Sequence, residues 1–481
     1  MLRYKNEIFK ISGRYQRKIF LLFGIVFCLM NVACKKFVEV DPPQNQITSA
    51  TVYANDLSAA SAVTAIYIQM ISNFSSFSQG QGSISELAGL NADEFDNYFA
   101  SNPTLSSCYT NKLTSTNSYF WQELYARIYE VNAVLEGLTT SSNITNSERQ
   151  QLIGEAKFLR AFFYFYATNI YGDVPLATTT NYQVNTSLHR TSQLTVYGQI
   201  IADLKDAQNL LSDNFVTPTD GVTTSERVRP NRGAASALLS RAYLYNTKWD
   251  SAEALATTVI NNTSLYNLDT LNGVFLANSN EAIWQLQPVN DGYNTFDAYF
   301  FVLNSIPGNS NQPVALTSSL MSTFEPGDER INNWVDSFAS GQTYYFPYKY
   351  KVNTYGQPLT EYLMVLRLAE QYLIRAEARA EQNELTGAAS DLNIIRMRAG
   401  LNPTTATSQA DILTAIQHER RVELFTEWGH RWFDLRRWGT AVPLLSSEKP
   451  NSVTEDDLLY PVPQSEISVN SNLTQNPGYQ P

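Results

Sequence analysis

The chain has 481 residues, and 43% of them are hydrophobic, which is enough to bury one large core or two to three smaller ones. Its formal net charge of −11 at pH 7 argues against general nucleic-acid binding, because an acidic surface repels the phosphate backbone. Glycine and proline occur at ordinary levels, which excludes collagenous and low-complexity classes. Aromatic residues make up an unusual 12% of the chain, so surplus rings on the surface could supply flat platforms for a ligand.

The first 33 residues have the pattern of a bacterial lipoprotein signal peptide. Basic residues precede an apolar run at residues 19–30, which is too short to span a bilayer as a helix. Cys34 follows at the distance expected of a lipidated cysteine, directly after the small Ala33, although Asn31 stands where a large apolar residue is usual. We therefore expect a signal peptide over residues 1–33 and a lipid on Cys34, with ordinary secretion as the alternative.

Residues 34–48 are polar and contain paired prolines, which is typical of an extended tether between a membrane and a folded domain. The folded domain is expected over residues 49–481. Cys108 is its single cysteine, so we expect no internal disulfide, and the stability must come from the size of the core.

Apolar residues recur every three or four positions through much of this domain, which predicts a mainly α fold. The small alanines of two expected helix pairs would let the helices approach closely, as in tetratricopeptide-like repeats. The turn of the second pair is expected to be two residues longer, and a non-repetitive bundle is the alternative. The expected helices are residues 57–73, 118–138, 147–171, 195–211, 232–246, 251–260, 363–382, 386–398 and 410–428. The matched positions are Leu239, Arg241, Ala242, Trp249 and Ala252 in one pair and Leu373, Arg375, Ala376, Leu385 and Ala388 in the other.

Two stretches, at about residues 75–117 and 264–360, lack helical periodicity and are rich in turn residues. Within the second, residues 281–286 predict a short strand, and residues 344–350 (YYFPYKY) are aromatic and extended. Loops on a rigid scaffold commonly carry binding residues. We therefore expect an irregular, loop-rich ligand-binding layer on the helical-repeat scaffold.

The sequence lacks complete catalytic and metal-binding motifs. His418 begins a stretch that resembles the zinc motif HExxH, but Val422 replaces the second histidine. Asp93 and Glu94 are the most suggestive carboxylate pair, yet sequence neighbours rarely both face one substrate, so an exposed acidic turn is favoured. We expect no metal site and no cofactor, while a glycosidase with paired carboxylates stays open.

Residues 419–439 read ERRVELFTEWGHRWFDLRRWG, in which five arginines face four carboxylates, so a phosphate-binding role is rejected. Glu427 precedes Arg431 by four residues, the favourable order for an ion pair within one helix. Gly429 indicates a break or a close helix contact. We therefore interpret the stretch as part of the scaffold, in which aromatic rings and ion pairs hold neighbouring helices together. At helical spacing, one apolar stripe would consist of Leu424, Trp428, Trp432 and Leu435.

This stretch closely resembles the C-terminal signature of the SusD/RagB family of surface lipoproteins from Bacteroidetes. Residues 155–176, EAKFLRAFFYFYATNIYGDVPL, resemble a second motif of that family. The LIRAEA helix, the lipobox and the KKFVEVDPP segment also fall in the family's order, so the resemblance covers essentially the whole mature chain.

The resemblance implies a tetratricopeptide-like scaffold with a loop-rich binding face, and a protein that is not an enzyme. It also implies a lipid-anchored protein on the outer-membrane surface that captures oligosaccharides and delivers them to a TonB-dependent transporter of the SusC type. A peptide ligand, as in the RagB branch, is the main alternative, and a surface glycosidase or a structural adaptor is less favoured.

Binding residues vary within such a family, so the candidates come from the two loop-rich stretches rather than from the motifs. Aromatic rings stack on sugar faces, and planar polar side chains exchange hydrogen bonds in the plane of the sugar ring. Core packing is the alternative for every ring, and it is favoured for Trp284 and Trp334, which lie in apolar segments. The candidates are Asp93, Asp96, Asn97, Tyr98 and Phe99 in the first stretch, and Tyr293, Asn294, Phe296 and Tyr299 in the second.

Overall fold

The computed structural model describes residues 49–449 and 451–480. The chain divides into two units, residues 1–51 and Val52–Pro481, and the fold described here is that of the second unit. The predicted signal peptide, the tether and Cys34 lie outside the described residues and stay predictions.

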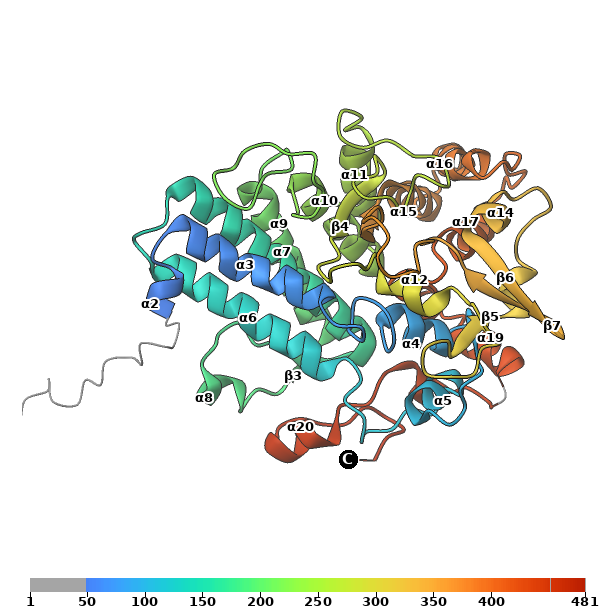
Figure 1. Cartoon of the computed structure of the whole chain (residues 1–481), viewed down its shortest axis with the longest axis horizontal. Helices are drawn as coiled ribbons and strands as arrows, with labels where there is room; N and C mark the ends of the chain where they lie inside the picture. Colours follow the sequence, from blue (N-terminus) through green and yellow to red (C-terminus); the bar gives the residue numbers. More distant parts are fainter. Residues whose placement is uncertain (1–48, 450, 481) are drawn as a thin grey trace, which may run out of the picture. The chain divides into compact units, whose positions relative to one another are not determined.

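The scaffold is a row of helices in which each helix packs against the one before it (Figure 1). An additional helix, α3 (Asp56–Ile71), packs across α6 and α7. Most of the expected helices are therefore confirmed to within a few residues. The row consists of α6 (Trp121–Thr140), α7 (Asn146–Tyr171), α9 (Gln193–Leu210), α10 (Arg232–Tyr245), α11 (Trp249–Ile260), α15 (Leu368–Glu381), α16 (Leu385–Arg398) and α17 (Gln409–Glu423).

The two helix pairs expected from the repeat signature form hairpins with equal turns. Residues 246–248 join α10 to α11, and residues 382–384 join α15 to α16, with a positive φ at Thr247 and Asn383. The prediction of a longer second turn is therefore wrong. Aligning the two pairs on their arginines shifted the first helices by two residues. Counted from the helix ends at Tyr245 and Glu381, the position equivalent to Ala242 is Ala378 rather than Ala376.

The expected helix at 363–382 begins five residues too early, because residues Leu363–Arg367 form strand β8. This strand pairs antiparallel with β4 (Ala282–Leu286), the strand expected at 281–286. All five residues of β8 are buried, so they show no alternation of apolar and polar side chains. A continuous apolar run of this kind does not distinguish a buried strand from a helix.

The two loop-rich stretches contain short helices and strands and form one layer. Strand β1 (Phe95–Asn97) of the first stretch pairs antiparallel with β5 (Val314–Leu316) of the second, with Phe95 opposite Leu316. Strands β6 (Val335–Ser340) and β7 (Gln342–Pro347) form a hairpin at one side of this layer (Figure 1). The remaining elements of the two stretches are α4 (Ile84–Asn91), α5 (Pro103–Tyr109), α12 (Phe296–Phe301), α13 (Ser318–Met321) and α14 (Arg330–Trp334).

Short elements complete the described chain. Trp284 and Trp334 are fully buried, as expected of structural residues. The short elements are α2 (Ser49–Val52), β2 (Val174–Pro175), α8 (Tyr182–Asn185), β3 (Arg190–Thr191), α18 (His430–Arg437), α19 (Ala441–Glu448), the 3-10 helix η2 (Glu455–Leu458) and α20 (Gln464–Val469).

The charged aromatic stretch at 419–439 is a buried part of the scaffold, as expected, but it is not one helix. Helix α17 ends at Glu423, and α18 begins after Gly429, where φ is +71°. The prediction of an ion pair between Glu427 and Arg431 is therefore wrong. Because the helix breaks between them, the two residues do not share one helical face. Glu427 accepts from Lys349 Nζ at 2.6 Å, while Arg431 pairs with Asp93 at 2.7 Å.

Candidate ligand-binding site

Four partly exposed rings gather around the beginning of α12: Phe74, Tyr293, Tyr299 and Tyr355, which we call the aromatic cluster. The ring centroid of Tyr293 lies 5.3 Å from that of Phe74, 5.7 Å from that of Tyr299 and 5.0 Å from that of Tyr355. All three pairs meet edge to face, the geometry that aromatic pairs prefer. Phe74 is 41% exposed and Tyr355 is 62% exposed, so the cluster presents ring surface to solvent.

Local backbone features place Tyr293 in this cluster. Gly292 adopts a φ of +76°, and its carbonyl accepts a hydrogen bond from Gly356 N at 2.8 Å, which joins the loop carrying Tyr355 to that carrying Tyr293. Thr295 then caps α12 by accepting from the amide of Ala298. The direction of the chain is therefore determined by a backbone hydrogen bond before Tyr293 and by the side-chain cap of Thr295 after it.

The loop that carries Phe74 is attached to α12 by buried polar side chains. Asp297 Oδ1 accepts from Gly80 N at 2.8 Å, and Gln79 Oε1 accepts from Phe296 N at 3.1 Å. The Phe296 ring stacks beneath Phe74 with 4.2 Å between centroids. These contacts hold residues 74–80 against α12, so Phe74 belongs to the same surface as Tyr293.

A second group of rings lies near the other end of α12. Tyr98 is 37% exposed and meets Tyr344 edge to face at 5.3 Å. Tyr344 packs against the apolar cluster that contains Val302 and Leu303, the residues directly after α12. We call Tyr98 and Tyr344 the tyrosine pair. Within residues 49–449 and 451–480, no ring contact joins this pair to the aromatic cluster.

Asp93 and Glu94 are buried, so the expectation of an exposed acidic turn is wrong. Asp93 forms ion pairs with Arg431 at 2.7 Å and Arg421 at 2.6 Å. Burial by itself raises the pKa of Asp93, but these arginines lower it below its usual value. Burial raises the pKa of Glu94 to about 8. The sequence could not reveal this environment, because Arg431 lies 338 residues from Asp93.

The other polar candidates accept hydrogen bonds from groups within the loop-rich layer. Asp96 accepts from the Tyr109 hydroxyl at 3.2 Å, and Asn97 Oδ1 accepts from Phe99 N at 2.9 Å. Asn294 is buried, and its Oδ1 accepts from the amides of Thr360 and Glu361 at 2.8 and 2.9 Å.

Among the aromatic candidates, Phe99 is partly buried against the core and Phe296 is buried beneath the cluster. Tyr98 is exposed, and Tyr293 and Tyr299 are half-buried like Phe99 but belong to the ring groups described above. The structure adds Phe74, Tyr344 and Tyr355 to them. The aromatic segment at 344–350 was a signal for Tyr344, and an isolated ring among the polar residues 73–76 was a signal for Phe74.

Two buried carboxyl groups lie beneath the loop of the aromatic cluster. Glu86 Oε2 accepts from Gly82 N at 2.6 Å, and Asp297 holds Gly80 as described above. Burial raises the pKa of Glu86 to about 7, with a smaller contribution from Asp297. Burial likewise raises the pKa of Asp297 to about 7. Both groups therefore keep their proton to a higher pH in the folded protein than in the unfolded chain.

Glu86→Gln is expected to stabilise the protein more at high pH than at low pH. The pKa of Glu86 rises from 4.5 to about 7 on folding, so its contribution to stability is lost as pH rises through this window. Glutamine stays neutral, so the free energy of unfolding of the variant relative to wild type should rise by about 3 kcal/mol across the window. Urea unfolding at pH 4.5 and at about pH 8 measures this difference. A difference that is the same at both pH values contradicts the prediction, and Asp297→Asn should shift in the same direction.

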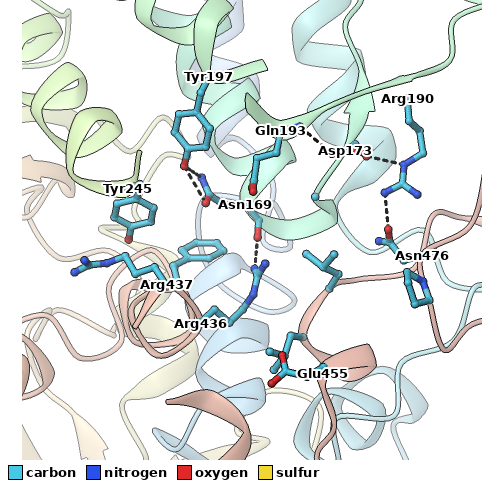
Figure 2. A pocket seen from close by; sticks show the side chains of 15 residues that line it. Asn169, Asp173, Arg190, Gln193, Tyr197, Tyr245, Arg436, Arg437, Glu455 and Asn476 are labelled. Carbon is cyan, nitrogen blue, oxygen red and sulfur yellow. Dashed lines mark hydrogen bonds between the residues drawn. The ribbon is translucent and has the colours of Figure 1, made fainter. Parts of the chain in front are cut away.

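Two cavities lie away from the rings. One, of about 670 Å³, lies between α7, α9, α18 and the C-terminal segment (Figure 2). The other, of about 410 Å³, is mostly apolar and lies between α6, α8 and α20. Within the described ranges, no cluster of three or more His, Cys, Asp or Glu side chains could hold a metal ion. No helix in that part of the chain combines the length and apolarity needed to cross a membrane.

Comparisons with known families match both halves of this structure. A family model described as the SusD family matches residues 336–479. A second, described as starch-binding and associating with the outer membrane, matches residues 36–244. The chain belongs to the SusD/RagB family. Proteins of the SusD/RagB family are non-catalytic binding proteins associated with the outer membrane, so the glycosidase alternative is not supported.

Individual SusD/RagB relatives cover three quarters or more of the chain. Two SusD-like proteins of Formosa agariphila are 24% and 27% identical, over 97% and 75% of this chain and 100% and 80% of their own lengths. A solved laminarin-binding SusD-like protein is 25% identical with a TM-score of 0.74, over 89% of this chain and all of its own. A SusD-like carbohydrate-binding protein of Bacteroides fragilis is 21% identical with a TM-score of 0.76, over 88% of this chain and all of its own. These structures confirm the predicted mainly helical, tetratricopeptide-like fold.

Proposed function

We propose that the protein binds oligosaccharides through the aromatic cluster and the tyrosine pair. The observation that carries this proposal is the set of partly exposed rings around Tyr293, whose backbone positions are determined by hydrogen bonds. Sugar rings have apolar CH faces that stack on aromatic rings, and preorganised rings bind with a smaller entropy loss than flexible side chains. Three of the predicted ligand residues, Tyr98, Tyr293 and Tyr299, belong to these surfaces.

The relatives support a glycan rather than another ligand. The 25% identical relative is described as laminarin-binding, and the family model over residues 36–244 is described as starch-binding. Laminarin and starch are both glucans, so short glucans are the first ligands to test. The buried candidates Asp93, Asn294 and Phe296 are assigned supporting positions rather than ligand contacts in this proposal.

The protein would act as a lipid-anchored receptor that passes its ligand to a TonB-dependent transporter of the SusC type. The signal peptide, Cys34 and the family resemblance support this part of the proposal. It requires an acyl group on Cys34 in the mass spectrum of the mature protein. It also requires the transporter to copurify with the full-length lipoprotein.

Tyr293→Ala and Tyr98→Ala are each expected to weaken glucan binding about tenfold, since loss of one stacking ring removes about 1.4 kcal/mol. Isothermal titration calorimetry with laminarin and starch oligosaccharides measures the change. Tyr182→Ala is the matched control, because Tyr182 is 71% exposed on α8 and belongs to neither ring group. Unchanged affinity in both variants would refute the site. Binding of a peptide panel in place of the glycans would favour the peptide alternative.

A further inference from the structure

The cavity of about 670 Å³ is lined by charged residues that the proposed glycan site does not use (Figure 2). Its volume lies in the range typical of small-molecule sites, about 300–1,000 Å³. One part of the lining is polar and includes Gln193, Asp173 and Glu455, and another is apolar and includes Phe433 and Leu459. Such a lining suits a small ligand that has both polar and apolar faces.

Arg436, in the last turn of α18, lines this cavity without a carboxylate partner within the described ranges. Its Nη1 donates to the carbonyl oxygen of Asn169, and its Nε and Nη2 have no hydrogen-bond acceptor there. Every other arginine of the 419–439 stretch is paired with Asp93, Asp434 or Glu377. Arg436 is therefore the exception in a region where arginines are otherwise neutralised.

The Arg436 guanidinium is half-buried, and the Trp432 ring, whose centroid lies 5.8 Å from Cζ, compensates its charge only in part. Burial lowers the pKa of Arg436 to about 10, and the opposing electrostatic contributions come from Tyr197, Tyr460 and Tyr245 rather than from carboxylates. A buried charge is costly unless an opposite charge and hydrogen bonds compensate it. An anion that entered the cavity would supply both, because the free Nε and Nη2 can donate to two oxygens of one carboxylate.

A second arginine lies on the same cavity and also has no ion pair among the described residues. Arg190 donates to the carbonyl oxygen of Asp173 and to Asn476 Oδ1 (Figure 2). It also donates to the carbonyl oxygens of Tyr171 and Thr474. Burial lowers its pKa, although Asp173 acts in the opposite direction.

The end of α7 offsets only part of these two charges. Asn169 and Tyr171 belong to the last turn of α7, so both arginines also satisfy carbonyls at that helix end. The helix dipole there is equivalent to about half a negative charge, which is less than two guanidinium groups carry. Capping of α7 therefore leaves Nε and Nη2 of Arg436 free to donate to a further acceptor.

We propose that this cavity binds a small acidic sugar, with the carboxylate on Arg436 and the hydroxyl groups toward Asp173 and Glu455. The two carboxylates are exposed, whereas Arg436 is partly buried, so the ligand would enter with its acid group first. Carboxylate oxygens accept hydrogen bonds from sugar hydroxyls, and Phe433 and Leu459 offer apolar surface to the ring. This site is separate from the aromatic cluster, and the proposal does not depend on the function proposed there.

Calorimetry with glucuronate as the probe tests the proposal on the full-length protein. Glucuronate is expected to bind wild type at least about tenfold more tightly than glucose or acetate, because each of these lacks one of the two recognised groups. Arg436→Met is expected to weaken glucuronate binding at least about tenfold, while Arg232→Met, an exposed arginine away from the cavity, should bind like wild type.

A second variant distinguishes a loss of binding from a loss of folding. Arg436→Lys keeps the charge but loses the planar fork, so its glucuronate affinity should lie between those of wild type and Arg436→Met at an unchanged unfolding temperature. The proposal is overturned if wild type does not bind glucuronate, if glucose binds equally well, or if both Arg436 variants keep full affinity. It is also overturned if Tyr293→Ala abolishes glucuronate binding, since the ligand would then occupy the aromatic cluster.

Discussion

Replacing Glu423 by glutamine is expected to lower the free energy of unfolding by about 3–5 kcal/mol, the usual effect of breaking a buried ion pair from one side. Glu423 is fully buried and faces three arginines, with Oε2 3.0 Å from Arg330 Nη1 and Oε1 paired with Arg367 and Arg398. Burial alone raises the pKa of Glu423, but the three arginines lower it far below its usual value. A neutral glutamine leaves their charges without this shared partner.

Chemical denaturation of the wild type and the variant measures this loss. Glu325→Gln is the matched control, because Glu325 also pairs with an arginine, Arg396 at 2.6 Å, but is itself 38% exposed. The free energy of unfolding of this control should fall by no more than about 1 kcal/mol, since solvent screens a surface ion pair. Equal losses in the two variants would contradict the prediction that burial sets the energy of the Glu423 network.

Gly80→Ala is expected to destabilise the protein by about 3 kcal/mol and to weaken glucan binding at the aromatic cluster. Gly80 has a φ of +74°, which disfavours a side chain by about 1–2 kcal/mol. An added Cβ would also lie 2.3 Å from the carbonyl oxygen of Phe74, so residues 74–80 must move. Because Phe74 is in the aromatic cluster, this movement alters the proposed ligand surface.

Gly82→Ala separates backbone strain from the steric clash. Gly82 has a similar φ of +75°, but the nearest atom to an added Cβ is the flexible Ser75 Oγ at 3.3 Å. This control should lose only about 1 kcal/mol of stability and keep its glucan affinity. Thermal unfolding and calorimetry on both variants test the comparison, and equal binding by Gly80→Ala and wild type would show that Phe74 is not required.

Helices with strong local signals were predictable from the sequence. α7 and α9 match the expected helices to within two residues, because apolar periodicity and turn residues act over a few positions. The β8 strand was misread as helix, since its pairing with β4 is decided by a segment about 80 residues earlier. The break between α17 and α18 was indicated by Gly429, but its effect on the Glu427 pair was not predictable.

The candidate site was predictable only in part. The loop-rich stretches and the tyrosines Tyr98 and Tyr293 follow from composition, whereas the exposure of each ring depends on what packs against it. Phe74 joins the aromatic cluster through residues more than 200 positions away, with Gly80 and Gln79 bonded to α12. No local pattern encodes such a contact.

The sequence by itself determined the helical scaffold, the balance of charges in residues 419–439 and the family to which the chain belongs. These properties depend on residue identity and short-range spacing. The tertiary structure decided which carboxylate each arginine meets, and it buried Asp93 beside Arg431 while leaving Arg436 without a carboxylate partner among the described residues. The reason is physical, because the energy of a charge depends on its burial and on neighbours that only long-range folding brings within a few ångströms.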